Sequence, residues 1–441
     1  MSVKGKLLEE AIDFAVKATT KKAERKSVAA AAKKAVKAAP AVLKTGSGKG
    51  RDLAADAFKV AGGKKKAYAD WVRENGRTGA LFDYSGLGKV PDVPQTQMPR
   101  YSPKKGTSAR MADLLSNPDV EQGVNATVER GLAGGGANWY NTDPLRERML
   151  AIHGEDEGAS RYAHLMDLVS ATSPRSKVPD NIRTASYYNY LSSNNIPFPD
   201  KPAPGYGSVA QNNHRSNALD VTERGGWDVF KNPKPASFST NLQGNQNNVT
   251  IDTHNMRLPS ILSRDPRFLM TSVKAGTKGD PETAMGALLA RYPDLPGAEV
   301  SRAVANFKDG QPDLAAYRPQ EWVEKGYLSM DDAVKDPVLW EAMPRANEYG
   351  PYEAWQQEQA KRLGVSPAQY QAAMWLGGGE DTGLASEAEP WLASMEKRIG
   401  YTADLLGMSA DEVMEAVLKG KMPLLAKGGR VDAAALAQKY A

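Results

Sequence analysis

From about residue 138 onward, apolar residues recur at the spacing of an amphipathic helix, and no run alternates apolar and polar positions as a strand does. The segment 163–169 is mostly apolar and predicts a helix that ends at Ser170-Ala-Thr-Ser-Pro174. Asp180 or Asn181 then caps a further helix, whose apolar positions continue at helical spacing to Leu191. The pattern therefore predicts an all-α fold.

Signals for helix starts continue through the second half of the chain. Ser366-Pro-Ala-Gln369 combines a serine cap, a proline at the first helical position and a glutamine three residues later, which is a capping box. Gly377-Gly-Gly379 predicts the end of that helix. Ser409-Ala-Asp-Glu412 is a second capping box, and Asp143-Pro144 predicts another helix start.

The first 77 residues differ in charge from the rest of the chain. They hold 19 Lys and Arg against 8 Asp and Glu, a net charge of +11, whereas residues 78–441 carry −6. Apolar residues at helical spacing between the lysines predict a basic helical arm over 1–77. Such an arm favours an anionic partner. The preferred partner is DNA, contacted through its phosphates, and the second choice is a membrane surface. The alternative is a solvated helix that docks on a partner subunit.

Composition also suggests how the chain is divided. Residues 78–137 are rich in Gly, Pro, Ser and Asn and predict an extended linker with one short helix near Ser108–Leu115. A helical body is expected over 138–400, with C-terminal helices and a tail over 401–441.

Several kinds of site and location are excluded or disfavoured. The chain has no cysteine, which excludes disulfides, thiolate zinc sites and a cysteine-ligated iron–sulfur cluster. The four histidines are not paired at metal-ligand spacing, so neither a metal nor another cofactor is expected. No apolar run is long enough to span a bilayer, and the N-terminus does not have the pattern of a secretory signal.

The most informative block is Val249-Thr-Ile-Asp252-Thr-His254, which is followed by Arg257. It resembles the Val-Asp-Thr-His-x-x-Arg signature of the helix-hairpin-helix DNA glycosylases, the endonuclease III family. In that family the Asp is the catalytic carboxylate, and a Lys eighteen residues before it is the amine nucleophile. Lys234 stands eighteen residues before Asp252. The resemblance implies a glycosylase-like body that acts on the N-glycosidic bond of a flipped base.

The residue types suit that chemistry. Breaking an N-glycosidic bond builds positive charge on the sugar, and a carboxylate such as Asp252 stabilises it. The apolar run before Asp252 predicts its burial, and Thr253 after it predicts a helix start, so Asp252 is also a candidate N-cap. A desolvated Lys234 would form a Schiff base with the sugar and permit strand cleavage by a lyase reaction. The alternative is a solvated lysine in a loop.

The resemblance extends to an earlier element. The stretch Leu168–Ala185 is similar to the glycosylase sequence of an apolar helix, a Ser/Thr-rich turn and an Asn-bearing helix, which makes Arg175 and Asn181 candidate DNA contacts. Trp139 and Tyr140 are candidates to wall the pocket of a flipped base, and otherwise belong to the core.

Around the central block, His254 is a candidate substrate or DNA contact and is expected to orient the turn through hydrogen bonds. Arg257 is expected either to contact a phosphate or to pair with an acidic neighbour. One part of the family pattern is absent. In the family, a hairpin with the sequence Leu-Pro-Gly-Val-Gly directs backbone amides toward a phosphate, whereas this chain has Asp228-Val-Phe-Lys-Asn-Pro233 at that place.

The signatures together, including the late Gln371-Ala-Ala-Met-Trp375, resemble proteins of tailed bacteriophages over roughly residues 139–380. Two functions follow. The first is a DNA glycosylase, with lyase activity if Lys234 is the nucleophile. The second is a structural or ejected virion protein that binds DNA or other virion proteins and keeps the glycosylase-like fold as an inactive scaffold. Either function implies a location in the phage virion or the host cytoplasm.

Overall fold

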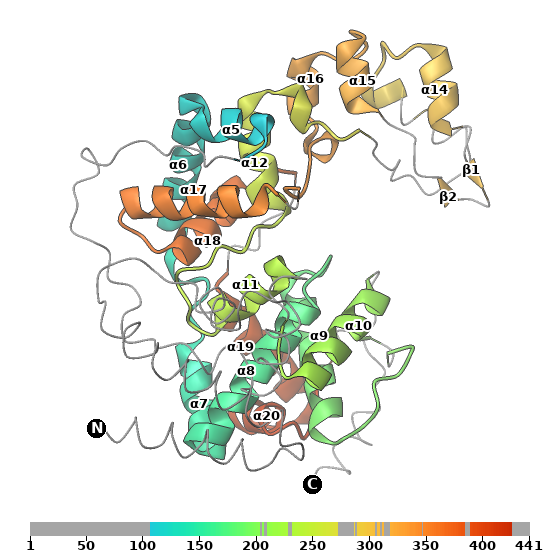
Figure 1. The fold of residues 1–441 in the computed structure, drawn as a ribbon. Helices are drawn as coiled ribbons and strands as arrows, with labels where there is room; N and C mark the ends of the chain where they lie inside the picture. The colour runs from blue at the N-terminus through green and yellow to red at the C-terminus, as the bar shows by residue number, and fades with distance from the viewer. Residues whose placement is uncertain are drawn as a thin grey trace, which may run out of the picture. The chain divides into compact units, whose positions relative to one another are not determined.

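The computed structural model describes residues 106–202, 205–206, 210–227, 232–271, 286, 289–304, 307–308, 311–312, 318–345, 347–383 and 389–425. The predicted basic arm, the linker before residue 106 and the C-terminal tail after residue 425 lie outside these residues. The fold is all-α, as predicted (Figure 1). In the described part of the chain, the strands are β1 (Phe307–Lys308) and β2 (Gln311–Pro312), a two-residue antiparallel pair. No helix there is both long and apolar enough to cross a bilayer.

The described residues form two compact units, and each is built from separate stretches of the chain. Unit 1 comprises Tyr140–Thr250 and the C-terminal segment from Glu389. Its helices are α7 (Asp143–His153), α8 (Glu155–Ala171), α9 (Val178–Ser193), α10 (Gln211–Arg224), α11 (Pro233–Leu242), α19 (Trp391–Leu406) and α20 (Ala410–Leu418).

Unit 2 comprises the segment that ends at Trp139 and the segment from Ile251 to Ala388. Its α-helices are α5 (Ala109–Ser116), α6 (Pro118–Ala133), α12 (Thr253–Ser263), α14 (Gly297–Val304), α15 (Pro319–Glu324), α16 (Met330–Val334), α17 (Tyr349–Arg362) and α18 (Pro367–Gly378). Its 3-10 helices are η4 (Gly136–Asn138), η5 (Pro266–Phe268) and η6 (Pro337–Leu339).

Helix α8 is the centre of unit 1. Its second half, from Tyr162 to Ala171, is buried on every side, and the helix contacts α7, α9, α10 and α11. Helix α9 begins at Val178, two residues before the predicted cap at Asp180 or Asn181. The physical reason is Pro179, whose backbone angle suits the first helical turn and extends the helix toward Lys177.

Helix α6 corrects the prediction of an extended linker for residues 118–133, which are helical. Asn117 caps this helix by accepting a hydrogen bond from the backbone N–H of Asp119, and a proline stands in the first turn. Two glycines of the predicted linker, Gly131 and Gly136, are packing positions against Ala373. A Cβ on Gly131 would lie 1.8 Å from the carbonyl oxygen of Ala373 in α18. The missing side chain lets α6 and α18 approach closely, and they form the most extensive helix pair among the described residues.

Both predicted capping boxes are confirmed. Ser366 accepts from the N–H of Gln369 at 3.1 Å, and the side chain of Gln369 accepts from the N–H of Ser366 at 3.0 Å. Ser409 and Glu412 form the same reciprocal pair at the start of α20. The short helix predicted near residue 108 is α5, capped by Ser108.

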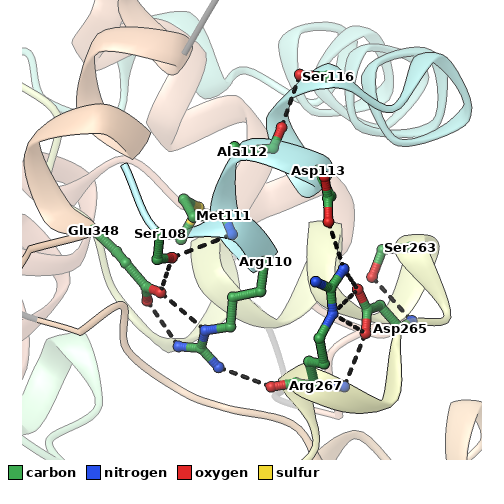
Figure 2. Close-up of polar contacts among 10 residues, drawn as sticks. All are labelled: Ser108, Arg110, Met111, Ala112, Asp113, Ser116, Ser263, Asp265, Arg267 and Glu348. Carbon is green, nitrogen blue, oxygen red and sulfur yellow. Dashed lines mark hydrogen bonds and ion pairs between the residues drawn. The ribbon is translucent and has the colours of Figure 1, made fainter. Parts of the chain in front are cut away.

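A buried ion pair ties α5 to the start of α17 (Figure 2). Arg110 donates to both carboxylate oxygens of Glu348, from Nε at 2.9 Å and from Nη2 at 2.7 Å. The hydroxyl of Ser108 and the backbone N–H of Arg345 donate to the same carboxylate. Burial alone would raise the pKa of Glu348, but the hydrogen bonds from Arg110 and Ser108 outweigh it and lower the pKa to about 2. The third guanidinium nitrogen of Arg110 donates to the carbonyl of Arg267 at 2.8 Å.

Candidate functional site

Asp252 is the N-cap of α12, which confirms the predicted helix start. Its Oδ1 accepts from the N–H of Asn255 at 3.0 Å, and Oδ1 of Asn255 accepts from the N–H of Asp252 at 3.3 Å. The Asp252 side chain is half-buried. Its second oxygen, Oδ2, makes no hydrogen bond to any residue that the structure describes. The carboxylate is therefore held by one oxygen, and the other stays available.

A buried polar network behind the cap holds Asn255 in place. Nε2 of Gln371 donates to Oδ1 of Asn255 at 3.1 Å, and Nδ2 of Asn255 contacts Sδ of Met374 at 3.3 Å. The hydroxyl of Tyr352 donates to the backbone carbonyl of Asn255. Because Asn255 in turn accepts from the backbone of Asp252, these side chains from α17 and α18 determine where the Asp252 carboxylate lies.

Sequence reasoning missed this network for two reasons. The usual capping box has Glu or Gln at its fourth position, and here Asn255 fills it. Tyr352 and Gln371 are 97 and 116 residues from Asn255 in sequence. The motif at 371–375 is visible in the sequence, but only the folded chain connects it with Asp252.

Tyr352 is fully buried beside this cap. Burial raises the pKa of its hydroxyl well above the ordinary value, and the negative charge of Asp252 raises it further. The phenol thus stays protonated at neutral pH and acts as a hydrogen-bond donor.

His254 makes the orienting hydrogen bond expected of it. Its Nδ1 lies 2.9 Å from Oγ1 of Thr382. The Thr382 hydroxyl donates to the carbonyl of Gly378 at 2.9 Å, so we assign the hydrogen between His254 and Thr382 to Nδ1 of the imidazole. The imidazole meets the ring of Trp375 edge-on, with ring centroids 5.8 Å apart. His254 therefore joins α12 to the turn that follows α18.

Trp139 and Tyr140 are almost fully buried. In unit 2, Trp139 meets Trp375 edge-on at 4.6 Å between ring centroids. In unit 1, Tyr140 meets Phe238 in the same way at 6.1 Å. The burial of both rings favours the core interpretation over a pocket wall.

Lys234 is the second residue of α11 in unit 1 and is half-buried. Hydroxyl groups from α8 anchor its helix at both ends. Ser170 donates to the carbonyl of Pro235, and Tyr162 donates to the carbonyl of Leu242 at 2.6 Å. Of the candidate site residues, Asp252, His254 and Arg257 all lie at the start of α12 or within it, in unit 2. Lys234 lies in unit 1.

Asn181 and Arg175 have different environments. Asn181 is buried, and its Nδ2 donates to the carbonyl of Val169 at 2.7 Å and to Oγ1 of Thr172 at 2.8 Å. This amide joins α9 to the end of α8. Arg175 is exposed in the turn between the two helices, with a left-handed φ of 57°. Of the two candidate DNA contacts, Arg175 is the one that solvent reaches.

Arg257 is buried in α12 and is 8% exposed. The expected alternatives were a phosphate contact or a pair with an acidic neighbour. Within the residues that the structure describes, Arg257 forms no ion pair.

Across the described ranges, no three His, Asp or Glu side chains gather in a way that could hold a metal ion. Comparison of the chain with models of protein families, with curated proteins and with solved structures finds no match.

Proposed function

We propose that this protein releases a base from DNA, and that Asp252 is the carboxylate that stabilises the positive charge of the sugar. The observation that carries the proposal is the state of the Asp252 side chain. One oxygen is committed to the helix cap and the other makes no hydrogen bond in the described structure, at a half-buried position. A carboxylate held in this way needs little reorganisation as charge develops nearby.

The partner in this proposal is DNA, and the basic arm at 1–77 neutralises its phosphates. Lys234 has the role of an amine that attacks the sugar after or during base loss. This role rests on the eighteen-residue spacing from the resemblance, so it is tested separately from Asp252.

A structural role in a virion is the second candidate function. The complete capping box at Asp252 favours it, because an Asp that caps a helix has a sufficient structural reason to be there. In that case the arm anchors the protein to packaged DNA or to another virion protein.

The decisive experiment uses the full-length protein and oligonucleotides that each contain one damaged or deaminated base. Asp252→Asn removes the charge but keeps a side chain that caps helices as well as Asp does. We expect base release to fall by about 100-fold or more, with little change in unfolding free energy. The matched control is Asp143→Asn, the same change at the exposed start of α7, which should leave activity intact.

Lys234→Gln tests the amine. We expect it to abolish the covalent adduct trapped by borohydride, and base release that survives would identify water as the nucleophile. Deletion of residues 1–77 should flatten the salt dependence of DNA binding, because each neutralised phosphate contributes about 0.9 to the slope. A wild-type protein that releases no base and traps no adduct would support the virion function instead.

A further inference from the structure

Arg257 is a buried arginine whose hydrogen-bonding capacity is unused. Its Nε is closed off from solvent and has no hydrogen-bond acceptor. Neither of its other two guanidinium nitrogens makes a hydrogen bond or an ion pair within the described part of the chain. Buried charges in proteins are nearly always paired, because leaving water without a partner costs free energy.

The carboxylate that acts electrostatically on Arg257 already has two hydrogen-bond donors of its own. Asp336 is the carboxylate whose charge acts on Arg257. One of its oxygens accepts from the guanidinium of Arg291, and the other accepts from the hydroxyl of Tyr292. Asp336 therefore neutralises Arg291, and the positive charge of Arg257 remains.

Arg110 shows what a satisfied buried arginine looks like in the same unit. It is 5% exposed, close to the exposure of Arg257, but all three of its nitrogens donate and two of them bind Glu348. The two arginines differ in their acceptors rather than in their burial. Burial also lowers the pKa of Arg257, whereas the hydrogen bonds of Arg110 outweigh burial and raise its pKa.

Contacts between neighbouring elements fix the positions of His254 and Asp336. His254 lies three residues earlier, on the same face of α12, and its Nδ1 is committed to Thr382. A Cβ on Gly383 would lie 3.0 Å from Cγ of Pro337, so the turn after α18 packs against the start of η6, next to Asp336. These contacts connect the turn after α18 with both α12 and η6.

We propose that Arg257 binds an oxyanion of the phosphate class. A planar guanidinium presents two parallel N–H groups, which match two oxygens of a phosphate and are poorly used by chloride. A bound phosphate group supplies the counter-charge that the described residues do not provide. The inference does not depend on the proposed base-release reaction. The phosphate comes either from a nucleic-acid strand or from free inorganic phosphate.

The test measures thermal unfolding of the full-length protein in chloride, acetate and inorganic phosphate at equal ionic strength and neutral pH. In phosphate well above its dissociation constant, the wild type should gain about 2–4 °C over chloride. Arg257→Met should lose this gain and be at least as stable as the wild type in chloride, because an unpaired buried charge has been removed. Arg257→Lys keeps the charge without the planar fork and should keep less than half of the gain.

Arg110→Met is the matched control. It should lower the unfolding temperature in chloride, because it breaks a buried pair, and keep the full gain in phosphate. An equal gain in Arg257→Met and wild type would refute the site, and an equal gain in acetate would refute the phosphate class. Binding of a short single-stranded oligonucleotide then separates the sources. Weaker binding by Arg257→Met identifies a strand phosphate, and unchanged binding identifies free phosphate.

Discussion

Replacing Glu348 by Gln tests the buried ion pair between α5 and the start of α17. The pKa of Glu348 gives the size of the expected loss of stability. The pKa of Glu348 falls from 4.5 to about 2, and each unit corresponds to about 1.4 kcal/mol, so the charged form contributes roughly 3 kcal/mol to stability. Removing one partner of a buried pair costs about 3–5 kcal/mol when the other charge is left unpaired. Arg110 keeps a second carboxylate partner, because its Nη2 also lies 2.7 Å from Oε2 of Glu341, so the cost should lie at the lower end of this range. We therefore expect Glu348→Gln to lower the unfolding free energy by about 3 kcal/mol in urea denaturation at neutral pH.

The pH dependence gives this prediction a second readout. The folded-state pKa of Glu348 lies below the unfolded value, so its contribution is present above pH 4.5 and is lost as the pH falls toward about 2. The gap between wild type and Glu348→Gln should close over that range. Glu157→Gln is the control, because it removes an exposed partner of Arg161 and should cost less than about 1 kcal/mol. A neutral-pH loss no larger than that of the control, or a gap that does not depend on pH, would refute the reasoning.

Two further predictions concern packing and protonation. Gly131→Ala should lower the unfolding free energy by about 2 kcal/mol or more, because the added Cβ would collide with the backbone of Ala373. Gly400→Ala places a Cβ in open space within a helix and should be neutral or stabilising by up to about 1 kcal/mol. Chemical denaturation measures both variants, and equal effects would contradict the close packing at Gly131. Burial lowers the pKa of His214, although its hydrogen bond to the carbonyl of Pro174 acts in the opposite direction. The stability that depends on the neutral imidazole is therefore present above pH 6.5 and is lost as the pH falls. His214→Gln should therefore reduce the loss of stability below pH 6.5, and an unchanged pH profile would argue against a neutral buried imidazole.

The features predicted correctly from sequence are those that depend on neighbouring residues. Ser366 with Gln369 and Ser409 with Glu412 form capping boxes because donor and acceptor lie within one turn. The helix start at Asp252 follows from the same local geometry.

The features that sequence did not reveal depend on distant partners. Helix α6 has a local start signal in Asn117 and Pro118, but its glycines are typical of a linker in sequence, because the elements they pack against, α12 for Gly123 and α18 for Gly131, are distant in the chain. The ion pair of Arg110 and Glu348 joins residues 238 apart. For Arg257, sequence left a phosphate contact and an acidic partner as equal alternatives, and only the folded chain reveals that Asp336 is already engaged.

The division of each unit into separate stretches has a consequence for the order of events at the ribosome. Helix α18 begins 234 residues after α6 ends. At the usual rate of synthesis, α6 emerges roughly 10–50 s before the helix that covers its glycine face. The stretch from Tyr140 to Thr250 is completed in between, but its unit also requires the segment after Glu389. Unit 2 can therefore be completed only after α18 has been made, and unit 1 only after the segment from Glu389 has been made. Until α18 emerges, the nascent protein must keep the glycine face of α6 uncovered.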